Sequence, residues 1–116
     1  MNKINVVKEL MNNGYTISQA FAICGVKHVS IPFSYNDLQF DVLEMPFDTR
    51  TKNALMRNHL TTIGDVIRYV EDGNKITSIH GLGVNSIKLL MENILDFLWD
   101  CLTNDEKEMV LIENVM

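Results

Sequence analysis

The sequence contains little cysteine, proline or glycine. Its 116 residues include two cysteines, two prolines and six glycines. Cys24 and Cys101 match no zinc spacing and no disulfide framework, which indicates a reducing compartment such as the cytoplasm. The scarcity of proline and glycine excludes a chain dominated by low-complexity linker.

Long apolar runs are also missing. The opening segment MNKINVVKELMNNGY has no apolar stretch of the length that a secretion signal needs, and no run elsewhere approaches the length of a membrane span. We therefore expect a cytoplasmic protein without a membrane partner.

Basic residues are outnumbered by acidic ones. The chain has 10 lysines and arginines against 15 carboxylates, a net charge of −5. This balance counts against a strong general affinity for nucleic acid, because phosphate neutralisation supplies most such affinity. Residues 99–116 hold one lysine and five carboxylates, whereas residues 1–36 hold three lysines and one glutamate. A binding face away from the acidic end can therefore be neutral or basic.

Catalytic and metal-binding signatures are absent as well. His28, His59 and His80 are far apart in the sequence and lack the spacing of metal ligands. No Ser/His/Asp or Cys/His arrangement has a local signature. We expect no enzyme, no metal site and no cofactor.

What the sequence does contain is apolar residues at helical spacing along most of its length. Helices are predicted over residues 3–12, from Thr16 to Cys24, over 49–58 after the N-cap Asp48, after Thr61 or Thr62, from Val84 to about Leu102, and after Thr103 or Asn104. A short helical turn is expected around Ile76 and Ile79, and Pro32 with the polar run SYND predicts a connection. No alternating strand pattern appears, so the predicted fold class is all-α, a compact bundle of short helices.

Two glycines stand directly before the longest predicted helix, in the segment HGLGVNSIKLL. The placement of Gly81 and Gly83 is that of a helix–hairpin–helix turn. Glycine permits positive φ and leaves no Cβ between the backbone and a ligand. The first N–H groups of the following helix, near Val84, Asn85 and Ser86, carry partial positive charge. The segment therefore favours either a tight structural turn or a phosphate-binding site.

Three ordered motifs, FDTRTKNALMRNHL, TTIGDVIRYV and IHGLGVNSIKLL, lie within residues 42–95. Their order and spacing resemble the C-terminal domain of the bacterial RNA polymerase alpha subunit. The resemblance is carried by Arg50, Asn53 and Leu55, by Ile63-Gly64-Asp65-Val66, and by Leu82, Gly83, Ser86 and Ile87. It covers about residues 42–98 and implies a bacterial or phage protein with that fold.

The resemblance implies a non-enzymatic DNA-binding module of the transcription apparatus. Its expected partners are double-stranded DNA, contacted in the A·T-rich minor groove, and RNA polymerase or a sigma factor. In this family-based assignment Arg50 enters the minor groove and Asn53 contacts the backbone or sugar. Gly83, Asn85 and Ser86 hold a phosphate.

Helical geometry supports part of this assignment. Arg50, Asn53 and Arg57 lie at positions i, i+3 and i+7, so one helix face presents all three. An arginine gains from the enhanced negative potential of a narrow A·T minor groove. Together with Gly81 of the turn, these residues complete the candidate interface.

Differences from the family favour an alternative function. Val84 and Asn85 stand where the family usually has lysine, and losing both charges removes roughly one or two phosphate contacts. The alternative is a protein-interaction module of the same fold that binds RNA polymerase, a sigma factor or a regulator, with little DNA affinity. Arg50 would then be a solvated residue that pairs with Asp48 or Glu44.

The remaining segments divide into an N-terminal helical extension over residues 1–36, the resembling domain over 42–102, and an acidic C-terminal helix or tail over 103–116. The segment TISQAFAICGVKHVSI has helix-turn-helix features at Ala20 and Gly25. However, Pro32 would end its second helix after about one turn, too short to follow the major groove. The alternative is an extension that packs on the domain or on a partner.

The far end of the long predicted helix carries apolar residues on more than one side, including Phe97, Trp99 and Cys101. Such a helix needs cover on several faces. The N-terminal helices, the last helix or a second copy of the chain in a homodimer could supply it.

Overall fold

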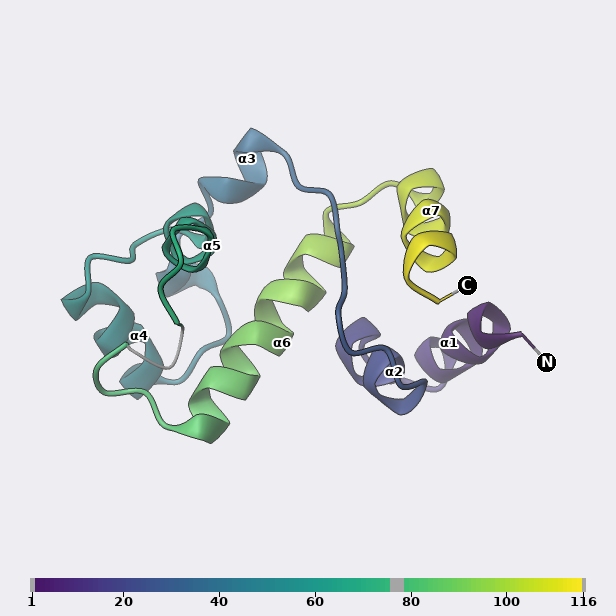
Figure 1. The fold of residues 1–116 in the computed structure, drawn as a ribbon, viewed down its shortest axis with the longest axis horizontal. Helices are drawn as coiled ribbons and strands as arrows, with labels where there is room; N and C mark the ends of the chain where they lie inside the picture. The colour runs from purple at the N-terminus through teal and green to yellow at the C-terminus, as the bar shows by residue number, and fades with distance from the viewer. Residues whose placement is uncertain (1, 76–78, 116) are drawn as a thin grey trace. The chain divides into compact units, whose positions relative to one another are not determined.

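The computed structural model describes residues 2–75 and 79–115, and the regular structure in these residues is helical (Figure 1). The elements are α1 (Lys3–Asn12), α2 (Ile17–Ile23), α3 (Tyr35–Leu38), the 3-10 turn η1 (Val42–Glu44), α4 (Thr49–Arg57), α5 (Ile63–Glu71), α6 (Val84–Asp100) and α7 (Asn104–Val115). An isolated antiparallel bridge joins Asp41 and Thr62. The prediction of an all-α protein is confirmed for the described residues.

Most of the predicted helix starts are confirmed. Helices α2, α4 and α5 begin after the N-caps Thr16, Asp48 and Thr62, whose side chains each accept a hydrogen bond from a backbone N–H of the first turn. The helical turn expected around Ile76 falls largely outside the described residues. None of the helices in residues 2–75 and 79–115 has the length and apolar character that crossing a membrane requires.

The chain forms two compact units, residues 1–33 with 95–116, and residues 34–94. This division differs from the ranges drawn from the sequence, because residues 95–116 pack with the N-terminal helices. The end of α6 and helix α7 carry apolar side chains that α1 and α2 bury. The first unit is therefore discontinuous in sequence.

The core of the first unit surrounds Trp99. Its side chain is buried and its ring meets that of Phe21 edge-on, with 6.5 Å between centroids and 81° between planes. Val7 of α1 and Val110 of α7 belong to the same buried cluster. The N-terminal helices and the last helix thus supply the cover that the end of α6 was expected to need.

A carboxylate from α6 caps α2 within this unit. Asp96 accepts hydrogen bonds from the backbone N–H of Ser18 at 2.9 Å and from its hydroxyl at 3.0 Å. Because the first N–H groups of a helix have no partner inside the helix, a carboxylate at this position both satisfies one of them and complements the helix dipole. Ser18 is buried, so the bond is shielded from water.

The helix-turn-helix expected in the N-terminal segment is not formed. Residues 24–34 contain no helix, so nothing follows α2 that could act as a recognition helix. Gly25 adopts a φ of +78°, and the backbone N–H of Val26 bonds to the carbonyl of Phe21. This left-handed ending stops α2, and Pro32, which has no N–H, does not allow helix to resume.

The second unit packs α3, η1, α4, α5 and the first part of α6 around Val42, Leu55, Ile63 and Leu90, all of which are buried. Residues 34–37 were predicted to be a connection, and this was wrong in part because the segment forms α3. A reciprocal capping box, in which Ser34 and Asp37 bond to each other's backbone N–H, stabilises this single turn.

Helix α5 approaches α3 closely at Gly64. A Cβ added to Gly64 would lie 2.9 Å from the carbonyl oxygen and 3.0 Å from the Cβ of Leu38. The packing of these two helices therefore requires glycine at this position.

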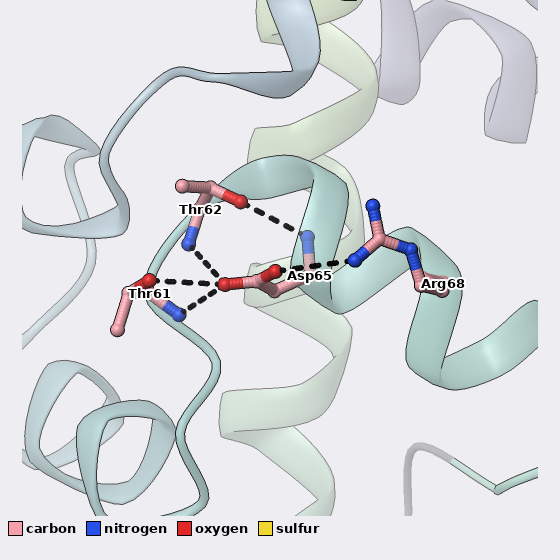
Figure 2. A network of polar contacts seen from close by, with 4 residues as sticks. All are labelled: Thr61, Thr62, Asp65 and Arg68. Atoms are coloured by element: carbon pink, nitrogen blue, oxygen red, sulfur yellow. Dashed lines mark hydrogen bonds and ion pairs between the residues drawn. The ribbon is translucent and has the colours of Figure 1, made fainter.

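Asp65 joins the start of α5 to the preceding chain (Figure 2). Its Oδ2 accepts hydrogen bonds from the N–H of Thr61 at 2.9 Å, the hydroxyl of Thr61 at 3.0 Å and the N–H of Thr62 at 3.1 Å. Arg68 lies 3.7 Å from its other oxygen. Burial alone would raise the pKa of Asp65, but the hydrogen bonds from the two threonines outweigh it and hold the pKa below its ordinary value.

We predict that Asp65→Asn destabilises α5 in a pH-dependent way. A depressed folded-state pKa stabilises the fold above the unfolded value of about 3.9 and loses this effect as pH falls below it. Amide hydrogen exchange gives the free energy of opening of α5, and it is compared between wild type and variant at each pH. We expect this free energy to be about 1 kcal/mol lower in the variant at pH 7, and the difference to shrink toward pH 3.

The control is Glu71→Gln, which makes the same charge change at the exposed last residue of α5. Removing a negative charge from a helix C-terminus is expected to be neutral or slightly stabilising. If the free energy of opening of α5 differs by the same amount between Asp65→Asn and wild type from pH 7 to pH 3, the prediction is contradicted.

Candidate nucleic-acid interface

Helix α4 begins after its N-cap Asp48, whose Oδ1 accepts a hydrogen bond from the N–H of Thr51 at 2.7 Å. The backbone and hydroxyl hydrogen bonds from Thr51 hold the pKa of Asp48 below its ordinary value, and the positive charge of Arg50 acts in the same direction. Among the described residues, neither Asp48 nor Glu44 forms an ion pair with Arg50. The pairing considered as the alternative role of Arg50 is therefore not present.

The helix sorts its residues into two faces. Thr51, Ala54 and Leu55 are buried against the core of the second unit. Arg50, Asn53 and Arg57 are exposed. The i, i+3, i+7 spacing thus leaves all three candidate residues of α4 on the accessible side.

The turn before α6 lies against the edge of α4 that carries both arginines, and Figure 1 shows this segment passing beside α4. The Nε of Arg50 donates a hydrogen bond to the carbonyl of Gly81 at 3.3 Å. A Cβ added to Gly81 would lie 2.8 Å from Nη2 of Arg57 and 3.5 Å from the Cβ of Ala54. Two guanidinium groups therefore adjoin one turn.

The two glycines of this turn have different roles. Gly81 adopts a φ of +94°, which favours glycine strongly. Gly83 was expected to share this property, but its φ is not positive, and a Cβ added there would meet nothing within 4 Å. Gly81 is thus required by its backbone conformation, whereas Gly83 faces open space.

Gly83 stands immediately before α6. Its carbonyl accepts a hydrogen bond from the N–H of Ile87 at 3.0 Å, so the N–H groups of Val84, Asn85 and Ser86 have no acceptor inside the helix. Gly83, Val84 and Asn85 are exposed, and Ser86 is half-buried. Backbone N–H groups at a helix start and arginine side chains are both groups that bind anions. The start of α6 and the arginines at the preceding turn therefore have the chemistry of an anion-binding site.

One nearby cation was not assigned from the sequence. Lys88 is exposed in the second turn of α6, four residues after Val84. The i, i+4 spacing places it on the same side of the helix as Val84, and this spacing could have identified it. Lys52, by contrast, donates its Nζ to the carbonyl of Leu43 at 2.9 Å.

Comparisons with protein-family models, curated proteins and solved structures found no match to this chain. The resemblance to the polymerase domain therefore depends on the three sequence motifs. Within residues 2–75 and 79–115, no three histidine, cysteine or carboxylate side chains are grouped so that they could hold a metal ion.

We predict that Gly81→Ala destabilises the second unit by about 1–2 kcal/mol, because an L-residue is strained at a φ of +94°. Urea unfolding followed by circular dichroism measures the loss. The matched control is Gly83→Ser in the same turn, where the added side chain has open space and serine is a favoured N-cap. Equal stability of Gly81→Ala and wild type would contradict the described turn.

Proposed function

We propose that residues 34–94 form a DNA-binding module of the transcription apparatus, which contacts the A·T-rich minor groove through Arg50 and a phosphate through the turn before α6. The observation that carries the proposal is the 3.3 Å hydrogen bond between Arg50 Nε and the Gly81 carbonyl. It holds a guanidinium against Gly81, in the turn that leads into the 17-residue helix α6.

The chemistry of arginine suits the groove contact. A guanidinium stays charged, is weakly hydrated and has five N–H donors, of which the bond to Gly81 uses one. Narrow A·T-rich minor grooves attract such a group through their enhanced negative potential. Because Arg50 is already held at its Nε, less side-chain entropy is lost when its terminal nitrogens bind DNA. Arg57 adds a second positive charge at the same turn.

The turn suits the phosphate contact. The absence of a side chain at Gly83 leaves the backbone open, and the N–H groups of Val84, Asn85 and Ser86 carry the positive end of the helix dipole. The Ser86 hydroxyl is one further donor. Resemblance of the three sequence motifs to the polymerase alpha C-terminal domain supports the same assignment, including the contact from Asn53.

The charge balance limits the expected affinity. Residues 34–94 carry six basic and eight acidic side chains, so attraction to DNA must come from the local site and not from the unit as a whole. A protein that makes few phosphate contacts shows a shallow salt dependence. We therefore expect modest affinity that depends on the position of a few donors.

One observation favours the second candidate function, a protein-interaction module that binds RNA polymerase, a sigma factor or a regulator. Val84, the first residue of α6, is 82% exposed, and Leu89 is 54% exposed. Apolar side chains at these positions would gain more from a protein surface than from a phosphate backbone.

The test is fluorescence anisotropy with A·T-rich and G·C-rich duplexes at about 50 and about 200 mM salt, for wild type, Arg50→Ala and Arg68→Ala. Arg68 is a matched control because it carries the same charge in the same unit, on α5, beside Asp65. We expect preference for the A·T-rich duplex and about tenfold weaker binding for Arg50→Ala, with little change for Arg68→Ala.

If Arg50→Ala and Arg68→Ala lose the same amount of DNA affinity, only the net charge matters and the proposed site is refuted. If wild type binds neither duplex at low salt, the DNA-binding proposal fails and the protein-interaction candidate takes its place.

A second variant tests the turn separately. Gly83→Asp supplies a favourable N-cap and complements the dipole of α6, so we expect stability to stay level or rise by about 0.5–1 kcal/mol. The new carboxylate would occupy the phosphate position, so DNA affinity should fall sharply. Gln39→Glu, exposed at the end of α3, makes the same charge change and should have a small effect. Unchanged affinity in Gly83→Asp would show that this turn does not contact DNA.

A further inference from the structure

A groove in the first unit lies between the extended segment around Ile31 and helix α7. Its cavity volume is about 390 Å³, within the range of roughly 300–1,000 Å³ typical of ligand clefts. We call it the α7 groove. Its apolar lining comes from Ile31, Pro32 and Met109, and its acidic lining from Asp105, Glu106 and Glu113.

Hydrogen bonds fix the two walls of the α7 groove to each other. Asn114 of α7 accepts from the backbone N–H of Ser30 at 2.7 Å and donates to the carbonyl of Ser30 at 2.9 Å. Its Nδ2 also donates to the carbonyl of Val110 at 2.7 Å, which orients the amide on the helix. The segment is therefore held at a defined position, and the side chain of Met109 beside it stays 53% exposed.

The charge of the α7 groove has one sign. No lysine or arginine lines it, and Lys107 lies instead over the ring of Trp99, 5.6 Å from its centroid. Glu106 accepts a hydrogen bond from the N–H of Thr103 at 3.0 Å and so caps α7. Among the described residues, Asp105 and Glu113 make no comparable bond.

We propose that the α7 groove docks a basic amphipathic segment of a partner protein. An apolar side chain of the partner would cover Met109 and Ile31, and a lysine or arginine beside it would pair with Asp105 and Glu113. The charge decides the occupant, because three carboxylates without a cation repel nucleic acid and acidic peptides and attract a cationic chain. This inference concerns the first unit and stands independently of the DNA-binding proposal.

The experiment uses the full chain and a fluorescein-labelled peptide of leucine and lysine at helical spacing, with a second peptide in which glutamate replaces every lysine. Binding is measured by anisotropy at about 0.15 M salt. Asp105→Asn with Glu113→Gln should weaken binding of the lysine peptide about fivefold, since each exposed ion pair contributes modestly. Met109→Ser should weaken binding as well, while the fluorescence of Trp99 stays that of the folded unit.

The matched control is Glu9→Gln with Asp100→Asn, two exposed carboxylates of the first unit that do not line the α7 groove. We expect this pair to change the affinity less than twofold, because the net charge alone does not make the site. The proposal is overturned if both double variants lose the same affinity for the lysine peptide. It is also overturned if the glutamate peptide binds as tightly as the lysine peptide, or if the lysine peptide does not bind. A dimer in sedimentation analysis that only the Asp105/Glu113 variant dissociates would also overturn it, by assigning the groove to a second copy of the chain.

Discussion

The hydrogen bond from Arg50 to Gly81 joins segments that are 31 residues apart in the sequence. The turn depends on glycine, because Gly81 adopts a φ of +94°, a conformation that strains residues with a side chain. Without this close approach, the arginines of α4 and the N-terminus of α6 would be separate features. With it, both arginines lie at the turn that leads into α6, and the proposed binding of DNA by the second unit depends on that arrangement.

The net charge of the chain restricts any attraction of DNA to the immediate surroundings of the two arginines. The chain has a net charge of −5, so its long-range field repels DNA, but screening at physiological salt limits that field to about 8 Å. Short-range contacts would then decide the proposed binding of DNA, and their small number implies weak affinity. A weak DNA contact becomes effective when a second contact raises the local concentration. The acidic α7 groove would supply such a contact within the same chain when the proposed basic partner protein is itself bound to the DNA.

Local signals in the sequence predicted much of the fold. Thr16, Asp48 and Thr62 each stand before an apolar pattern at helical spacing, and each caps a helix. The apolar pattern at helical spacing did not predict α3, because this single turn is held by its capping box and by its contact with Gly64. Arg50 and Gly81 could be named as candidates, but their contact could not be derived from spacing. The α7 groove was not foreseen, because Ser30 and Asn114 are 84 residues apart.

The turn before α6 has two possible explanations, a tight structural turn and a phosphate-binding site, and Gly83 is the residue at which they differ. The positive φ accounts for Gly81, but neither the backbone nor the packing requires glycine at Gly83, where φ is not positive and the surrounding space is open. Helices α1 to α5 begin after a side chain that accepts a hydrogen bond from the first turn, and Thr103 does the same for α7. Glycine is itself a favoured N-cap residue, and it costs only roughly a few tenths of a kcal/mol relative to serine or aspartate, so α6 loses little stability by starting after Gly83. Gly83 leaves the space before the first N–H groups of α6 free of a side chain, which is the arrangement that the proposed phosphate contact requires.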